Sequence, residues 1–287
     1  MSQQPVAQVC KDESSSTRVH PLFSAENADI VLSSKDDTHF RVRSQLLRET
    51  SGWFNTLLSI PSNAPDTADT DIICLDETAD ILAALLRMVS GFEIPELHPI
   101  NLCEDILYAA EKYEMPGPVS IIRVALSSNL LDASPIRIYG IAARRGWAAE
   151  AKAASTRTLP LDLFHPDAVA ELNRLDGPVL MKLLLLHHSR RQAFKAALDD
   201  TRTFYASGGS TLCGGCAQHV DHIQWALCKY SWVTQAPITH DILHEESARK
   251  ALESTCPHCG KSLYMQYATI GILKGIIDGL PRAVEFP

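Results

Sequence analysis

Two Cys-x-x-Cys pairs constrain the fold of this chain more than any other feature of its sequence. The pairs are CGGC at 213–216 and CPHC at 256–259. The two-residue spacing lets both thiolates of a pair bind one ion, and two pairs complete the tetrahedron that Zn²⁺ prefers. We therefore expect a structural zinc site in which four protein ligands leave no open position for catalysis. Its ligands are Cys213, Cys216, Cys256 and Cys259.

The sequence leaves alternatives open for these cysteines. A neighbouring side chain could replace one of the four ligands; the candidates are Cys228, His219, His222 and His258. The thiols could also be buried without a metal, or one pair could be redox-active. A redox pair normally begins a helix in a βαβ context, and the sequence around these two pairs indicates no such context.

The segment between the two pairs is longer than the ~15–20 residues of compact four-cysteine modules and has room for a helix. Apolar spacing predicts this helix over 217–230. Val220, Ile223, Leu227 and Tyr230 are expected near one face of this helix. Trp225, Trp232 and Tyr230 are expected in the core beside the two Cys-x-x-Cys pairs; the alternative is that they form a ridge that binds a partner. So short a segment cannot build a sufficient core alone, so the ion is expected to staple it.

The composition limits the classes of partner. The chain has 287 residues and a net charge of −8, which excludes a broad basic surface for nucleic acid. Basic and acidic residues are nearly balanced in 205–287, so nucleic-acid binding is not expected there either. No stretch reaches the ~18–20 apolar residues of a membrane span. The N-terminus lacks the apolar region of a secretory signal.

These observations lead us to expect a cytoplasmic and/or nuclear protein with reduced thiols and no membrane partner. Cys74 and Cys103 fall within apolar strand and helix patterns, so we expect them to be small buried hydrophobic side chains.

The N-terminal half of the chain predicts a small α+β unit. Residues 1–25 are polar and without periodicity, which predicts a disordered or loosely docked tail. Period-two alternation then predicts a hairpin, and helical spacing follows. The expected elements are strands at 29–32 and 39–43, a helix from an N-cap at Ser44 through Leu58, a loop at 61–70, a strand at 71–75, and helices beginning near Asp80 and Leu102.

From 116 to about 200 the pattern is helical and interrupted by prolines and glycines, which predicts short helices with short connections. His187-His188 is expected at the end of one of these helices. ASGGS at 206–210 has the composition of a flexible linker. The expected organisation is a tail at 1–25, an α+β domain at 26–130, an all-α extension at 131–204 and a zinc-stapled helical unit at 205–287.

Several segments of the α+β unit carry a shared family pattern. They are DIVL at 29–32, FRVRSQLL at 40–47, SGWF at 51–54 and AAEKYEM at 109–115. An acidic residue opening a strand, a leucine helix, a Ser-x-aromatic-Phe pair and a later Ala-Ala-x-Lys-Tyr helix resemble a BTB/POZ domain. The whole arrangement is similar to a large fungal group of BTB-containing proteins.

The resemblance implies an interaction module and, in dimeric members, a charged pocket near the dimer seam. That pocket pairs an Asp on the first strand with a basic residue after the strand-end histidine. Asp29 matches the first position, whereas Arg43 stands in place of the histidine and Ser44 in place of the basic residue. Arg43 is therefore the candidate partner of Asp29. The alternative is that Asp29 caps the strand edge and Arg43 is solvated.

Taken with the resemblance, the sequence indicates a non-enzymatic protein–protein interaction adaptor. The resemblance implies recruitment of a partner to a cullin-type ubiquitin ligase complex, so the expected partners are a cullin or a second copy of the chain in a homodimer. The alternative is a nuclear transcriptional co-regulator that acts through BTB self-association.

Overall fold

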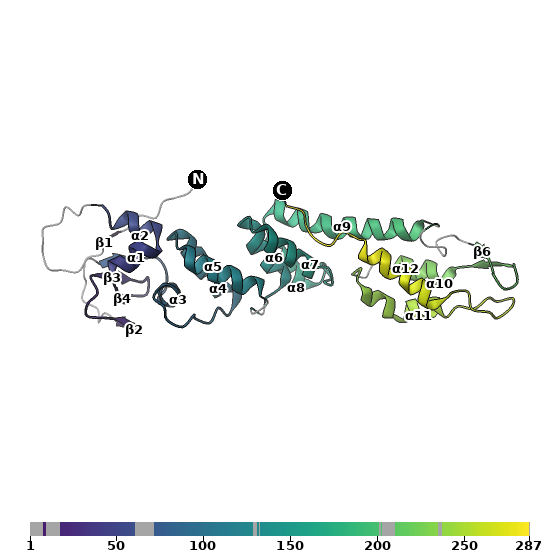
Figure 1. Ribbon diagram of the computed structural model, residues 1–287, viewed down its shortest axis with the longest axis horizontal. Helices are drawn as coiled ribbons and strands as arrows, with labels where there is room; N and C mark the ends of the chain where they lie inside the picture. Colours follow the sequence, from purple (N-terminus) through teal and green to yellow (C-terminus); the bar gives the residue numbers. More distant parts are fainter. Residues whose placement is uncertain are drawn as a thin grey trace. The chain divides into compact units, whose positions relative to one another are not determined.

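The computed structural model describes residues 8–9, 18–60, 72–128, 131, 133–200, 202, 210–234 and 237–286. The chain divides into two compact units, which we call unit 1 (Met1–Asp132) and unit 2 (Ala133–Pro287). Unit 1 combines a small sheet with helices and unit 2 is mostly helical, which confirms the coarse α+β class (Figure 1). Among the described helices, none is both long and apolar enough to cross a membrane.

The sheet of unit 1 is built around the expected antiparallel hairpin. Its strands are β3 (Ile30–Ser33) and β4 (Thr38–Val42). Ser34 closes the turn twice, because its backbone N–H donates to the carbonyl of Thr38 at 3.0 Å and its hydroxyl accepts the N–H of Thr38 at 3.0 Å. Asp37 supplies the left-handed residue that the turn needs, with a φ of 57°.

Three further strands extend the hairpin into a sheet with the order β1-β5-β3-β4-β2. The strand β5 (Ile72–Cys74) runs parallel to β3, as the expected third strand. The strand β2 (Arg18–Ser24) runs parallel to β4, and the two-residue strand β1 (Gln8–Val9) pairs antiparallel with β5.

The strand β2 overturns part of the prediction for residues 1–25, which were expected to be disordered or loosely docked. Phe23 is 4% exposed, and its ring packs against Phe40 at a centroid distance of 5.7 Å. The ring of His20 stacks on Phe40 at 4.9 Å. Two rings in an otherwise polar segment show no periodicity in the sequence, yet they bury enough surface to hold the strand at the sheet edge.

The helices of unit 1 share a core with the sheet. Almost fully buried side chains come from the strands, as with Leu32 and Phe40, and from the helices, as with Leu47, Phe54 and Ile106. The expected loop at 61–70 lies outside the described residues. The helices are α1 (Ser44–Thr50), α2 (Gly52–Leu57), α3 (Ala79–Val89), α4 (Ile100–Lys112) and α5 (Pro116–Ser127).

The single helix expected from Ser44 through Leu58 is two helices, because Ser51 leaves the helical conformation with a φ of −139°. Its hydroxyl donates to the carbonyl of Tyr113 at 2.5 Å and accepts the N–H of Phe54 at 3.0 Å. Ser51 therefore caps α2 while tying it to the end of α4. Ser44 is not the N-cap of α1, which is Arg43.

Unit 2 begins with helices that mostly start at proline. Pro135, Pro166 and Pro178 stand in the first turn of their helices, where the missing N–H has no intrahelical partner to lose. The long helix α9 continues past His187-His188 to Asp199, so the prediction that these histidines end a helix is wrong. The helices are α6 (Pro135–Arg144), α7 (Ala148–Arg157), α8 (Pro166–Leu172) and α9 (Gly177–Asp199).

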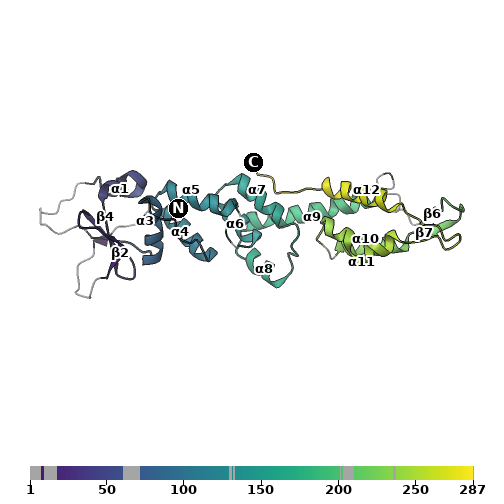
Figure 2. The ribbon, with the colours of Figure 1, turned by 60° about the horizontal axis from the view of Figure 1, so that its bottom comes forward.

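The rest of unit 2 packs against the C-terminal half of α9, so the segments expected as an extension and as a zinc unit share one core (Figures 1 and 2). Phe194 and Leu198 of α9 join Trp225, Trp232 and Leu273 in this core. Residues 206–209 of the expected linker lie outside the described residues. The elements are β6 (Ser210–Leu212), β7 (His219–Asp221), α10 (Ile223–Thr234), the 3₁₀ helix η2 (His240–His244), α11 (Glu246–Leu252) and α12 (Gln266–Asp278).

The helix α10 differs from its prediction in both start and orientation. It begins at Ile223 rather than 217, because His219–Asp221 pairs with β6 in a hairpin. Its buried face carries Trp225, Cys228 and Trp232, which confirms the tryptophans as core residues. The apolar face that the spacing indicates is solvent-exposed except for Val220, which precedes the helix. Its exposed residues are Ile223 (61%), Leu227 (61%) and Tyr230 (68%).

Candidate metal centre

The two Cys-x-x-Cys segments of unit 2 fold into knuckles with the same backbone hydrogen bonds. In the first, Cys213 N–H donates to the carbonyl of Gln218 at 2.8 Å, and Ala217 N–H donates to the carbonyl of Cys213 at 2.8 Å. In the second, the corresponding bonds run from Cys256 to Lys261 at 2.8 Å and from Gly260 to Cys256 at 2.9 Å. Two segments far apart in sequence therefore adopt one local geometry.

Each knuckle also turns a backbone amide toward its first sulfur. Gly215 N–H donates to Cys213 Sγ at 3.3 Å, and His258 N–H donates to Cys256 Sγ at 3.4 Å. Such amides stabilise thiolates, the form that binds metal. A Cβ at Gly215 would lie 3.3 Å from Cys259 Sγ and closer still to the Lys261 side chain, so glycine permits the two knuckles to approach one another.

The residue after each pair needs a left-handed backbone. Ala217 has a φ of 58° and Gly260 a φ of 69°. Glycine adopts this conformation freely, whereas alanine is strained in it. Gly260 therefore adopts the required conformation without strain, whereas Ala217 adopts it at a cost.

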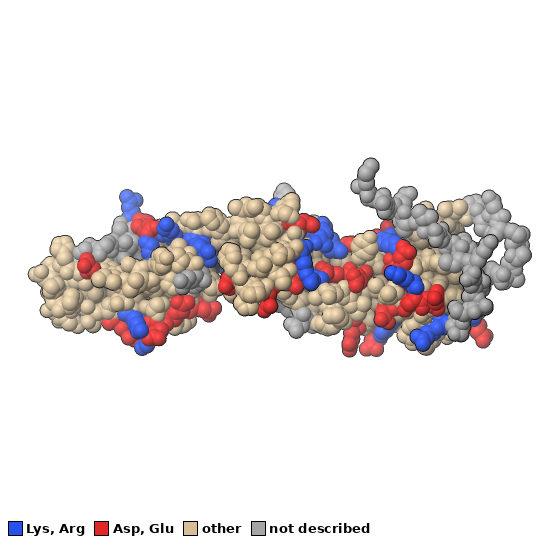
Figure 3. All heavy atoms as spheres, turned by 180° about the vertical axis from the view of Figure 1, so that it is seen from behind, with Lys and Arg blue, Asp and Glu red and all other residues tan. Residues whose placement is uncertain are grey.

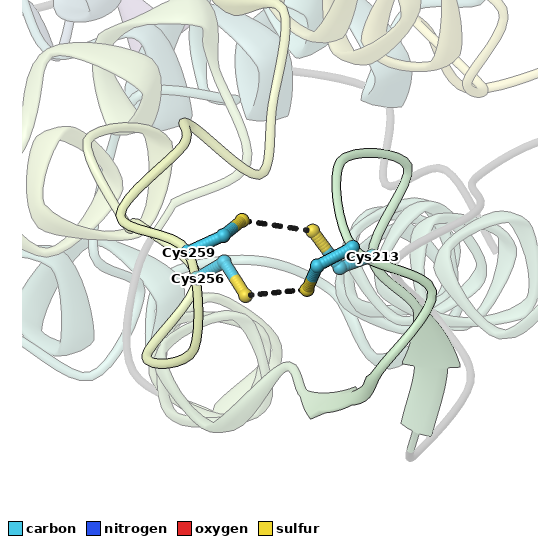
Figure 4. A group of neighbouring side chains, drawn as sticks. Cys213, Cys256 and Cys259 are labelled. Carbon is cyan, nitrogen blue, oxygen red and sulfur yellow. Dashed lines mark hydrogen bonds between the residues drawn. The ribbon is translucent and has the colours of Figure 1, made fainter.

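The four cysteines predicted as ligands come together as one cluster, which we call the four-cysteine cluster (Figure 4). All four sulfur atoms lie within 4.8 Å of one another. Across the two knuckles, Cys213 Sγ is 3.8 Å from Cys259 Sγ and Cys216 Sγ is 3.7 Å from Cys256 Sγ. These distances exceed the ~2.05 Å of a disulfide. They match the edge of about 3.8 Å that a tetrahedron with Zn–S bonds of ~2.3 Å would have. The cluster can therefore hold a metal ion.

The protonation of the four-cysteine cluster is uneven. The backbone N–H groups of Gly215 and Cys216 lower the pKa of the Cys213 thiol to about 6. The N–H of Gln218 lowers the pKa of Cys216, but burial and the neighbouring sulfurs outweigh it and raise that pKa to about 12. Four thiols this close cannot all ionise without a cation, because each negative charge opposes the next.

The cluster rests on a small apolar base. Cys213 and Cys256 are 6% and 1% exposed, and Val220 and Leu263 pack against them. Cys259 is exposed. This arrangement leaves one edge of the site open to solvent and gives the other a low-dielectric wall.

The alternative ligands named from the sequence do not join the four-cysteine cluster within the described part of the chain. His222 is buried and its Nδ1 is hydrogen-bonded to the hydroxyl of Tyr264. Cys228 is 1% exposed in the core of unit 2, where burial raises its pKa to about 12. Each side chain is thus held by its own structural partners, and neither belongs to the four-cysteine cluster.

The other predicted site residues, Asp29 and Arg43, are not paired with one another among the described residues. Asp29 instead accepts the backbone N–H of Ser44 at 2.6 Å and its hydroxyl at 2.5 Å. Burial raises the pKa of Asp29, but the two hydrogen bonds from Ser44 outweigh it and hold the pKa below its usual range. Arg43 is exposed. Ser44, which stands at the position of the basic residue in the family pattern, is thus the hydrogen-bond partner of Asp29.

The remaining cysteines differ in their state. Cys103 is 1% exposed and lies among the buried side chains of α4, as expected. Cys74 is half-buried and disulfide-bonded, so the prediction of a buried free thiol is wrong there.

A structural group that the sequence analysis missed is Arg190, which is 7% exposed. Its guanidinium donates to the carbonyl of Ile238 at 3.0 and 2.8 Å and to that of Pro281 at 2.9 Å. A signal was present in the sequence, because Arg190 continues the helical spacing of Leu186 and Phe194. A charged residue within an apolar helical stripe indicates a buried side chain that forms hydrogen bonds with neighbouring segments of the chain.

No protein-family model matches the chain, and no curated protein matches it. The BTB/POZ resemblance of unit 1 therefore stays a prediction from the sequence pattern.

Proposed function

We propose that this chain is a protein–protein interaction adaptor in which unit 1 is a BTB/POZ-like module and unit 2 carries a second docking surface. Unit 1 supports the proposal through its order of hairpin, paired short helices, third strand and further helices. By the family resemblance, this module recruits a cullin-type ubiquitin ligase scaffold or a second copy of the chain.

We also propose that the four-cysteine cluster binds one structural Zn²⁺ ion. The support is the match between its sulfur distances and the edge of a zinc tetrahedron, together with the donor set of four thiols. The bound ion would join the β6–β7 knuckle to the second knuckle, and so fix the start of α10 against the loop before α12.

The observation that carries the adaptor proposal is the exposed apolar face of α10. We call Ile223, Leu227 and Tyr230 the α10 stripe; each is more than 60% exposed. They follow the i, i+4, i+7 spacing of one helical face, and the opposite face holds the two tryptophans. A helix with apolar residues on two opposite faces normally buries both, so a protein partner is the proposed cover for the α10 stripe.

The charges of the surface fit a protein partner. On the face shown in Figure 3, acidic and basic side chains of the described residues are interspersed without a broad basic patch. Phosphate recognition needs clustered Lys and Arg, whereas a protein interface has an apolar centre with a polar rim.

The test is affinity capture of the tagged full chain followed by quantitative mass spectrometry. The wild-type chain is compared with one triple variant and with one double variant as the control. One variant carries Ile223→Ser, Leu227→Ser and Tyr230→Ser. The matched control carries Met181→Ser and Leu185→Ser, which remove two apolar side chains that are each 55% exposed on α9 of the same unit. Zinc content is measured for both, so that a loss of fold is distinguished from a loss of docking.

We expect the wild-type chain and the α9 control to capture cullin subunits and a common set of other proteins. The α10 variant should keep the cullin subunits and lose part of that other set at least tenfold. Unchanged capture by the α10 variant would contradict the docking surface. Recovery of chromatin factors without cullin subunits would favour the nuclear co-regulator instead.

A further inference from the structure

Unit 2 contains a cavity apart from the four-cysteine cluster. Its volume is about 290 Å³, near the lower end of the ~300–1,000 Å³ of small-molecule sites. The cavity lies between the segment after α7, the middle of α9 and the residues that precede η2. Apolar side chains form one part of its wall: Leu159, Leu161, Leu163, Leu184, Pro237 and Ile238.

Cationic and histidine side chains of α9 form another part of the wall: His187, His188, Arg190 and Arg191. The guanidinium of Arg190 donates to the carbonyls of Ile238 and Pro281, so its hydrogen bonds go to neutral groups and its positive charge is retained. A positive charge held in a low-dielectric wall attracts an anion more strongly than the same charge in water.

Arg191 is the group with spare donors. Its Nε is buried without a hydrogen-bond partner among the described residues. A buried donor left unsatisfied is costly, and a carboxylate satisfies a guanidinium with two parallel hydrogen bonds. The acidic side chain in the lining is Asp162. Its carboxylate accepts the backbone N–H of Phe164 at 2.9 Å and so stabilises the local turn.

The rim of the cavity is apolar. Phe164 lines the cavity and is 79% exposed, although phenylalanine is among the side chains most often buried. A ligand with an apolar body would cover this ring and the leucines beside it. A simple inorganic anion would leave them in contact with water.

We propose that this cavity binds a small organic carboxylate. The carboxylate pairs with the guanidinium of Arg191, and the apolar body lies against Leu161, Leu184 and Phe164. The proposal goes beyond the adaptor function, because it involves neither unit 1, nor the α10 stripe, nor the four-cysteine cluster.

Isothermal titration calorimetry of the full chain with hexanoate tests the proposal. Two ligands serve as matched comparisons: hexan-1-ol keeps the apolar body without the charge, and acetate keeps the charge without the body. Hexanoate should bind at least about tenfold more tightly than either, because a charge-assisted pair and the buried methylenes each contribute that much. Equal affinity for hexanoate and hexan-1-ol would overturn the role of the cation, and equal affinity for hexanoate and acetate that of the apolar wall.

Two variants and one control locate the site. Arg191→Gln should weaken hexanoate binding about tenfold or more, whereas Lys195→Gln, which removes a positive charge from an exposed position on α9, should not change it. Phe164→Ala should weaken hexanoate and leave acetate unchanged; because the ring is exposed, this change leaves the fold intact. Wild-type affinity in both variants would show that hexanoate binds elsewhere and would end the proposal.

Discussion

The carboxylate of Asp29 accepts both the backbone N–H and the hydroxyl of Ser44 in the first turn of α1. It thereby satisfies a helix N-terminus, where backbone donors lack intrahelical acceptors. At the scale of single residues, Ser44 stands where a basic side chain was expected. Asp29 therefore accepts hydrogen bonds at the helix N-terminus instead of forming an ion pair.

Asp29→Ala should lower the free energy of unfolding of unit 1 by about 1 kcal/mol, the usual cost of losing a cap. The measurement is urea denaturation followed by the fluorescence of Trp53, which lies in α2 of unit 1. Arg43→Ala is the control and should change little, since Arg43 is exposed. An equal loss in both variants would indicate that the two side chains form a pair after all.

His187 gives unit 2 a dependence on pH. Burial, followed by the charges of Arg191 and Arg190, lowers the pKa of His187 from 6.5 to about 4. Its Nε2 lies 3.0 Å from the hydroxyl of Thr158, which itself donates to the carbonyl of Ser155. The Thr158 oxygen is therefore the acceptor, and the neutral ring carries its proton on Nε2.

Between pH 6.5 and about 4 the unfolded chain binds a proton at His187 and the folded chain does not. The neutral His187 therefore makes its full contribution to the free energy of unfolding above pH 6.5. As the pH falls from 6.5 to about 4, the free energy of unfolding decreases by at most about 3 kcal/mol. His187→Gln should flatten this part of the stability profile measured by urea denaturation. A wild-type slope that persists in His187→Gln would assign the effect to other groups.

At the scale of elements, the two knuckles repeat one backbone with different residues at the left-handed position. Ala217→Gly should stabilise the first knuckle by about 0.5–1 kcal/mol, because relief of strain outweighs the added entropy of the unfolded chain. Gly260→Ala should act in the opposite direction. Urea denaturation of the two zinc-loaded variants measures both changes in stability. A loss of stability in Ala217→Gly would contradict the proposal that Ala217 is strained.

The four-cysteine cluster predicts one Zn²⁺ per chain. Cys213→Ala should abolish binding, because three sulfurs leave the tetrahedron incomplete. Cys228→Ala is the matched control: it removes a buried cysteine that lies outside the cluster, and should retain the metal. Elemental mass spectrometry of the purified variants gives the number of zinc ions per chain. A metal-free wild-type chain of full stability would end the zinc proposal.

At the scale of the whole molecule, the chain has two compact units, each with its own buried core. Such units unfold as separate cooperative transitions. Because the four-cysteine cluster belongs to unit 2, a chelator should lower one calorimetric transition and leave the other in place. Of the four tryptophans, Trp53 lies in unit 1, and Trp147, Trp225 and Trp232 lie in unit 2. A chelator that shifts both transitions equally would show that the units unfold together.

Features that depend on neighbours in the sequence were predictable. The β3–β4 hairpin follows from period-two alternation around a polar turn, and the helix starts in unit 2 follow from proline in the first turn. The grouping of the cysteines at 213, 216, 256 and 259 into one cluster follows from the reach of two thiolates across two residues. In each case local chemistry permits few conformations.

The tertiary structure decided the features in which a local pattern has more than one solution. The helix α10 has apolar residues on two opposite faces, so spacing alone could not choose between Leu227 and Trp225 as the buried side. The choice came from tertiary packing, in which Trp232 lies against Phe194 and Trp225 against Trp232. Phe23 and Arg190 likewise gained their roles from partners distant in sequence. The sequence by itself determined which residues could bind a metal and where elements could begin. Packing determined which faces meet, because burial depends on what lies opposite.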